Sequence, residues 1–214
     1  MVTSTLGILV GLAGIEHGFF EMLQGNVKPS GIFIEAIGPE QRFWENGLEP
    51  AVTIIPNFLV TGILAMIVGF LVTIWAGAFV QRKYGARVLF LLSIILWLVG
   101  GGFAPIFFTI FAPVTATRIN KPLMWWRTHL PVSVQGFLAK LWPGVLITFV
   151  LSFWISVELI IFGYPLLWFF NADVTFAIVN TLAFIILGLM AVTILAGFAY
   201  DIQNQPDSQQ SPAS

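Results

Sequence analysis

The stretch Leu6-Gly-Ile-Leu-Val-Gly-Leu-Ala-Gly-Ile-Glu-His-Gly-Phe-Phe-Glu-Met-Leu-Gln-Gly25 decides how this chain folds. It is apolar over enough residues to form a membrane helix, yet it contains the ionisable residues Glu16, His17 and Glu21. An ionisable group within the hydrocarbon of a bilayer costs several kcal/mol, so it normally faces a partner, a cavity or a substrate path. The stretch therefore predicts a membrane helix that carries a buried polar site.

The composition of the whole chain indicates a membrane protein. Of its 214 residues, 58% are hydrophobic and 9% are charged, whereas soluble domains carry about 25% charged residues. The polar residues are too few to cover a water-soluble globule of this size. The predicted fold class is all-α, a polytopic integral membrane helix bundle in a prokaryotic-type cell membrane.

Five apolar segments are long enough to cross roughly 30 Å of hydrocarbon at about 1.5 Å per residue. They predict a single transmembrane domain over residues 1–200, followed by a polar, disordered tail at 201–214 that is rich in Pro, Ser and Gln. The N-terminus lacks a basic region, so we expect the first segment to remain as a membrane helix. The predicted spans are residues 5–23, 54–80, 88–112, 138–162 and 174–200.

Two connecting segments are predicted to lie at the membrane surface. In residues 29–50, Pro39 can open a short helix with Glu40 in its first turn; an ordinary solvated acidic loop is the alternative. Residues 117–141 combine tryptophans with basic side chains, a composition typical of interfacial segments.

The basic residues create a conflict over topology. Seven of the nine Lys and Arg residues fall in two clusters. If residues 88–112 crossed the membrane once, these clusters would lie on opposite sides of it. Positive residues, however, prefer the cytoplasmic side. The favoured interpretation is one kinked helix. The alternative is a re-entrant hairpin that is broken at Gly100-Gly101-Gly102 and returns to the side it came from. The clusters are Arg82, Lys83 and Arg87, and Arg118, Lys121, Arg127 and Lys140.

Helical phase separates the polar residues of the first span. At about 100° per residue, one narrow face consists of glycines and predicts close GxxxG-type packing against another helix. His17, Glu21 and Gln24 lie together on the flank of that face, and Glu16 points away from it. We expect Glu16 to find a partner elsewhere in the bundle and Glu158 in the fourth span to pair with the first helix, with Asn57 and Asn180 as supporting hydrogen-bonding groups. The glycine face contains Gly7, Gly11, Gly14 and Gly18.

The absence of several known motifs argues against other kinds of function. The chain has two histidines, no H-E-x-x-H and no Glu-x-x-His repeat, so we assign no metal site; ligation by His17 and Glu21 with Glu16 or Glu158 is the alternative. There is no cysteine, no P-loop and no G-x-S-x-G motif, so the sequence indicates no enzyme and requires no cofactor. The net charge of −1 provides no basic field for nucleic acid.

Three functions fit these observations. The first is transport of protons, ions or small solutes through a buried site of Glu16, His17, Glu21 and Glu158. The second is an accessory subunit of a larger membrane complex, and the third is an intramembrane enzyme or cofactor protein that acts on lipid, quinone or haem. The expected partners are the lipid bilayer and either further copies of the chain or a larger membrane complex, because so small a chain needs neighbours to build a pathway.

Overall fold

A computed structural model describes residues 2–102, 111–112, 115–116 and 128–204 of the chain. The described part is a helix bundle, as predicted. Four helical stretches are long and apolar enough to cross a membrane: α1 (Val2–Leu23), α2 with the π-helix η1 (Phe58–Ile74 and Trp75–Phe79), α6 (Val132–Phe162) and α7 (Ala172–Asn204). The other elements are the shorter apolar helix α3 (Gly85–Leu98), the strands β1 (Phe33–Glu35) and β2 (Pro50–Val52), and the 3-10 helix η2 (Leu166–Trp168).

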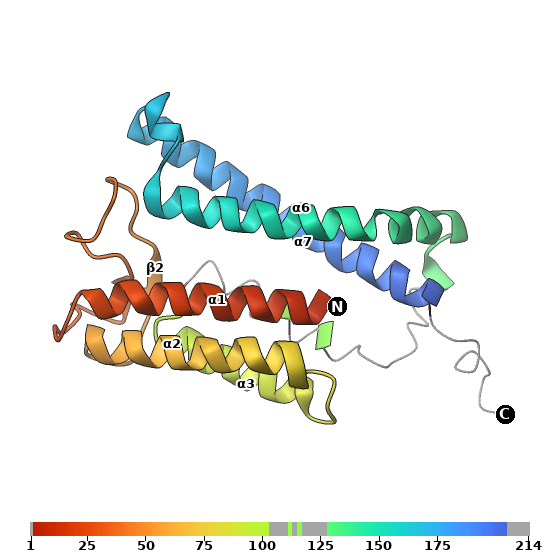
Figure 1. Ribbon diagram of the computed structural model, residues 1–214, viewed down its shortest axis with the longest axis horizontal. Coiled ribbons are helices and arrows are strands. Elements are labelled where there is room, and N and C mark those ends of the chain that lie inside the picture. Colours follow the sequence, from red (N-terminus) through yellow and green to blue (C-terminus); the bar gives the residue numbers. More distant parts are fainter. Residues whose placement is uncertain (1, 103–110, 113–114, 117–127, 205–214) are drawn as a thin grey trace.

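The helices form two neighbouring groups (Figure 1). Helices α1, α2 and α3 pack together, and α6 and α7 form an antiparallel pair beside them. A shared apolar core joins the groups, with Leu6 and Val10 of α1, Phe149 of α6 and Met190 of α7 among its buried residues. The main core of the described residues is therefore shared by both groups of helices, with α1 between them, and two small clusters lie around Ile37 and Ala51.

The two ends of this bundle carry different charges. At one end lie Val2, the 80–84 turn and the beginning of α6; we call this the basic end, because Arg82, Lys83, Arg87 and Lys140 are exposed there. At the other lie Leu23, the loop of residues 24–57 and the connection between α6 and α7, which we call the acidic end. Exposed Glu35, Glu40 and Glu45 belong to that loop. The exposed residues named here thus carry positive charge at the basic end and negative charge at the acidic end.

The glycine face of α1 packs against α2 and α3. A Cβ atom at Gly18 would lie 2.6 Å from the carbonyl oxygen of Gly62, and one at Gly69 would lie 2.6 Å from that of Gly11. Gly7 meets Ala76 of η1, while Gly14 meets Leu96 of α3. The backbones approach so closely that only hydrogen fits between them, which maximises van der Waals contact between membrane helices.

The third apolar segment is not one continuous helix, and that favoured interpretation is wrong. Helix α3 spans about 21 Å and ends at Leu98, where Val99 pairs with Thr53 in an isolated β-bridge. Gly102 lies against His17, yet the hydroxyl of Thr3 donates to that of Thr115 over 3.1 Å, back near the beginning of α1. The described residues 85–102 thus run from the basic end to the glycines beside His17, and Thr115 lies back near the beginning of α1, a placement that agrees with the re-entrant alternative.

The loop of residues 24–57 contains a short hairpin in place of the predicted interfacial helix. No helix begins at Pro39; strands β1 and β2 pair antiparallel, with Ile34 opposite Ala51. The hairpin continues towards its tip through the bonds from Ala36 N to Glu49 O and from Ile37 N to Leu48 O. We call residues 33–52 the acidic hairpin, and it folds back over the acidic end of α1 (Figure 1).

The last two helices are longer than predicted. Helix α6 begins at Val132, so residues 132–141 belong to it and not to a separate interfacial segment. Helix α7 continues to Asn204, beyond the predicted start of the tail. Arg118, Lys121, Arg127 and residues 205–214 lie outside the described residues.

Candidate cation-binding site

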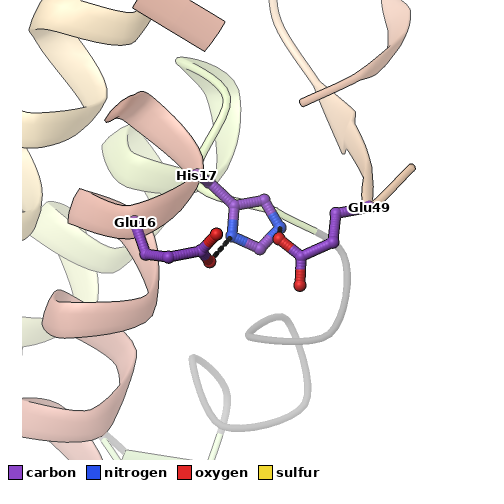
Figure 2. Close-up of side chains that lie close together, drawn as sticks. All are labelled: Glu16, His17 and Glu49. Atoms are coloured by element: carbon purple, nitrogen blue, oxygen red, sulfur yellow. Dashed lines mark ion pairs between the residues drawn. The ribbon is translucent and has the colours of Figure 1, made fainter. Parts of the chain in front are cut away.

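His17 lies between two carboxylates that come from different parts of the chain (Figure 2). Its Nδ1 atom is 3.2 Å from Oε2 of Glu16, the preceding residue on α1, and its Nε2 atom is 3.4 Å from Oε2 of Glu49 in the acidic hairpin. The imidazole is only 3% exposed. This arrangement contradicts the phase argument that separated Glu16 from His17, because the flexible Glu16 side chain reaches back to the neighbouring ring.

The backbone of α1 fixes which nitrogen of His17 carries hydrogen. Nδ1 lies 3.0 Å from the carbonyl oxygen of Ala13, one turn earlier. A carbonyl oxygen can only accept, so Nδ1 is the donor. In neutral His17 the lone pair of Nε2 therefore faces Glu49, and two electron-rich atoms meet unless a proton or another cation lies between them.

Glu49 enters the site through a strained backbone. Its φ angle is +39°, the only positive φ among the described non-glycine residues, although a residue before proline normally prefers an extended conformation. Such a conformation costs of order 1–3 kcal/mol and persists only where the surrounding structure enforces it. Here it turns the Glu49 side chain towards α1, where it is 6% exposed.

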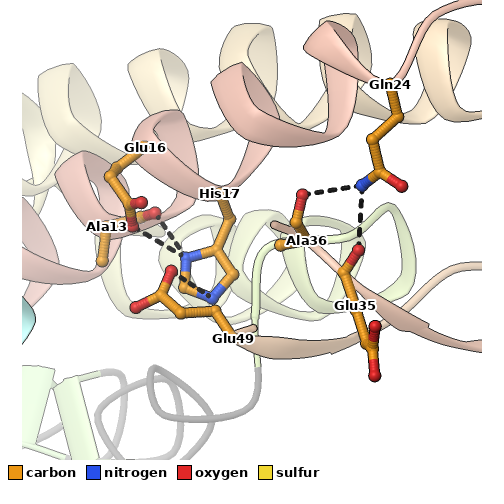
Figure 3. Close-up of polar contacts among 7 residues, drawn as sticks. All are labelled: Ala13, Glu16, His17, Gln24, Glu35, Ala36 and Glu49. Carbon is orange, nitrogen blue, oxygen red and sulfur yellow. Dashed lines mark hydrogen bonds and ion pairs between the residues drawn. The ribbon is translucent and has the colours of Figure 1, made fainter. Parts of the chain in front are cut away.

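Gln24 ties the acidic hairpin to the end of α1 (Figure 3). Its Nε2 atom donates to the carbonyl oxygens of Glu35 and Ala36 over 2.9 and 2.8 Å. Because the N–H of Ala36 in turn donates to the carbonyl of Glu49 over 2.8 Å, Gln24 helps to set the position of Glu49. Gln24 was predicted to join His17 directly; it supports the site through the hairpin instead.

The triple glycine closes the site from the side of α3. Gly100 and Gly102 have φ angles of +99° and +88°, which L side chains rarely adopt. A Cβ atom at Gly100 would overlap the Glu21 carboxylate, and one at Gly102 would overlap the His17 ring. The glycines therefore allow the chain to turn while lying directly on these two side chains.

The site contains more negative than positive groups. Glu21 is completely buried, and neither of its carboxylate oxygens has a hydrogen-bond partner among the described residues. Both oxygens of Glu16 and Oε2 of Glu49 also lack a regular hydrogen bond among the described residues, although the two Oε2 atoms lie 3.2 and 3.4 Å from the nitrogens of His17. Burial raises the pKa of Glu49 well above its usual range, and the charge of His17 opposes that rise. If ionised, these carboxylates would lack full compensation, because one imidazole lies among three acids.

A cavity of about 250 Å³ opens onto His17 and Glu49. It lies between the acidic hairpin and helices α6 and α7, so it connects the site with the acidic end. Its other walls are largely apolar, with amide groups supplied by two asparagines. The lining residues are His17, Trp44, Asn46, Leu48, Glu49, Pro50, Ile160, Phe176, Val179, Asn180 and Ala183.

The other predicted site residues are dispersed. Glu158 is exposed on α6 and forms no ion pair with any described residue, so its predicted contact with α1 is wrong. Asn57 caps α2, where its side chain accepts from the N–H of Val60 over 3.1 Å. Asn180 bonds to the carbonyl of Phe176 within α7 but also lines the cavity.

Sequence reasoning missed Glu49. It appeared as one of four glutamates in a polar loop, with nothing in its spacing to set it apart. The available signal was the stretch Phe43-Trp-Glu-Asn-Gly-Leu-Glu-Pro50, where aromatic and turn-forming residues surround two acids. In the structure, Nε1 of Trp44 donates to the carbonyl of Ile160 over 2.8 Å and fastens this stretch to α6.

Comparison with known proteins adds no relative to this description: no protein-family model, curated protein or solved structure matches the chain. The site must therefore be interpreted from its own geometry.

Proposed function

We propose that this chain is a small membrane protein that binds a cation at Glu16, His17 and Glu49 and transports it. The observation that carries the proposal is the pair of carboxylates facing both nitrogens of one buried imidazole. Buried ionisable groups in membrane helices typically mark ion or proton pathways. Glu21 adds a further buried carboxylate one turn along α1.

The position of the site gives the pathway a direction. His17 lies six residues, or about 9 Å, before the end of α1 at Leu23, and the cavity opens at the same end. A cation therefore enters from the acidic end, where the hairpin glutamates attract it. From there it meets the buried carboxylates first and the apolar core of the bundle afterwards.

The charge distribution supports an orientation for this pathway. Arg82, Lys83, Arg87 and Lys140 are exposed at the basic end, and positive residues prefer the cytoplasmic face, so we propose that this end lies in the cytoplasm. The chain lacks cysteine, so single-cysteine variants can be labelled cleanly in intact cells. We expect Glu40→Cys to react with a membrane-impermeant maleimide and Tyr84→Cys to react only after lysis. The reverse pattern would contradict the orientation.

Reconstitution into vesicles tests transport. Vesicles that enclose a pH-sensitive dye or a divalent-cation-sensitive dye are exposed to a gradient of the corresponding ion, and the initial rate of dye response is measured. We expect a flux that falls at least tenfold in Glu49→Gln and remains within twofold of wild type in Glu45→Gln, an exposed residue of the same hairpin. Equal rates in empty and protein-containing vesicles for both dyes would overturn the proposal.

One observation favours a second function, that of a subunit in a larger membrane complex. Glu158 is exposed in the mostly apolar second half of α6, and an acid in such a position gains most from a partner chain that offers a basic or polar side chain. Native mass measurement after extraction in mild detergent tests this function. A discrete larger assembly that Glu158→Leu dissociates supports it, and a monomer in both cases contradicts it.

A further inference from the structure

We infer that Glu16, His17 and Glu49 together bind one divalent first-row transition-metal ion, of the class from Mn²⁺ to Zn²⁺. This inference rests on the proposed cation-binding function and names its cation. One ligand atom from each of the three residues lies within 4.8 Å of the other two, although the residues come from a helix and from a hairpin 32 positions later.

The strongest geometric argument concerns His17 and Glu49. Two ligands that each lie about 2.1 Å from a tetrahedral ion are about 3.4 Å apart. The separation between Nε2 of His17 and Oε2 of Glu49 is 3.4 Å. An ion therefore fits between these two atoms without a change in backbone.

The hydrogen bond from Nδ1 to Ala13 prepares His17 for this role. Metal-binding histidines usually donate their other ring N–H to a carbonyl or carboxylate, which fixes the tautomer and the ring orientation. Here the distance from Nδ1 to the Ala13 oxygen is 3.0 Å. A Cβ atom at Gly102 would lie 2.4 Å from Nε2, so only glycine leaves this nitrogen free of a side-chain overlap.

Glu16 supplies the third ligand. It is the most accessible of the three, at 19% exposed, and neither carboxylate oxygen has a hydrogen-bond partner among the described residues. Its carboxylate lies beside Nδ1 and not Nε2, so its side chain would have to turn to bring an oxygen to the ion. Water from the adjoining cavity of about 250 Å³ can complete the coordination.

Burial of an unpartnered carboxylate provides a second, independent argument. Glu49 is 94% buried, and its Oε2 atom, directed towards His17, accepts no hydrogen bond from the described residues. Its backbone is also held at a positive φ. A folded protein accepts such costs at functional sites, and a bound dication offsets the burial of both carboxylates.

The set of ligand atoms limits the choice of metal. One imidazole nitrogen with two carboxylate oxygens suits Mn²⁺, Fe²⁺ or Zn²⁺, whereas Mg²⁺ and Ca²⁺ prefer oxygen alone. The chain contains no cysteine, so the soft thiolate sites that select Cu⁺ are absent. We therefore expect Zn²⁺ and Mn²⁺ to bind more tightly than Mg²⁺ or Ca²⁺.

The test uses the full chain, purified in detergent and stripped with a chelator. Titration calorimetry with Zn²⁺ and with Mn²⁺ is expected to give one site per chain. Glu49→Gln should weaken binding at least tenfold, because one of three protein ligands is lost, and Glu45→Gln should bind as wild type does. No binding of either metal by the folded wild type, or unchanged binding in Glu49→Gln, would overturn the inference.

A spectroscopic measurement guards against a misfolded variant. Bound Mn²⁺ in the wild-type protein is expected to show electron-spin-echo modulation from one imidazole nitrogen, and Glu45→Gln should show the same. The signal should disappear in His17→Gln that elutes as a single folded species. Mn²⁺ bound without nitrogen modulation in the wild type would show that His17 is not a ligand and would overturn the site.

The metal titration and the vesicle assay can fail separately. Stoichiometric metal binding without flux of either ion supports the metal site and overturns transport. A proton flux that Glu49→Gln abolishes, in a protein that binds neither Zn²⁺ nor Mn²⁺, supports the proposed transport and overturns the metal site.

Discussion

Helix α1 has two faces that are buried in opposite ways. On one face, Gly11 and Gly18 lie against the backbone of α2 and against its small side chains Thr73 and Ala65. On the other, Glu16 and His17 meet Glu49 from a hairpin that folds over the helix. The first face leaves no room for a Cβ atom at its glycines, while the second has carboxylate oxygens without a regular hydrogen bond among the described residues and opens onto a cavity.

The difference shows how one helix can carry both the packing of the fold and its polar site. Glycine contacts stabilise α1 against α2 without polar groups, so the bundle does not depend on the buried acids for its assembly. The polar face is then free to keep unpaired charge. We expect changes on the glycine face to alter stability most, and changes on the polar face to alter ligand binding at a smaller cost in stability.

The largest effect is expected from Gly18→Ala. The new Cβ would lie 2.6 Å from the carbonyl of Gly62, and such overpacking costs about 3 kcal/mol. Gly188→Ala is the matched control, because Gly188 lies in α7 with open space around it. Alanine there should stabilise the helix by up to about 1 kcal/mol. Thermal unfolding in detergent measures both, and equal shifts in the two variants would contradict the close α1–α2 contact.

An intermediate effect is expected from Gly102→Ala, which targets the polar face. Alanine at a φ of +88° costs roughly 1–2 kcal/mol, and its methyl group displaces the His17 ring. Zn²⁺ affinity should fall at least tenfold while the bundle remains folded. Gly31→Ala, on an exposed part of the loop with nothing near it, should leave both stability and affinity unchanged. An unaltered Zn²⁺ affinity in Gly102→Ala would show that the triple glycine does not shape the site.

The smallest effect is expected from Gln24→Leu. This change removes two hydrogen bonds to the hairpin, which together contribute about 1–2 kcal/mol. The loss should be local, so hydrogen exchange of the Ala36 and Ile37 amides should accelerate about tenfold while amides in α2 exchange as before. Gln81→Leu, at an exposed position of the basic end, serves as the control. Equal acceleration in α2 would mean that the hairpin and the bundle unfold together.

Much of the fold follows from the sequence, because membrane helices form wherever enough apolar residues are consecutive. The glycine face of α1 also follows from its period. Hydrophobicity alone could not show that 88–112 is broken, since both halves of that segment are apolar; the information lay in Gly100-Gly101-Gly102 and in the placement of the basic residues.

The site was only half predictable. Glu16, His17 and Glu21 stand out because they interrupt an apolar run. Glu49 does not, because its role depends on a hairpin register and a positive φ that local sequence preferences argue against. The prediction for Glu158 fails for the opposite reason. Its position within an apolar helix indicates burial, but the face of α6 that is buried is decided by packing between segments that are distant in the sequence.

The bond from Trp44 to Ile160 has a mechanical consequence. The acidic hairpin belongs by sequence to the connection between α1 and α2, yet through this bond it is also attached to the end of α6. Gln24 holds the same hairpin to α1. The hairpin thus connects the two groups of helices. The distance between Nε2 of His17 and Glu49 therefore depends on how far apart the two groups lie. A change in the tilt of α6 relative to α1 would therefore move the hairpin and alter the distance between Glu49 and His17.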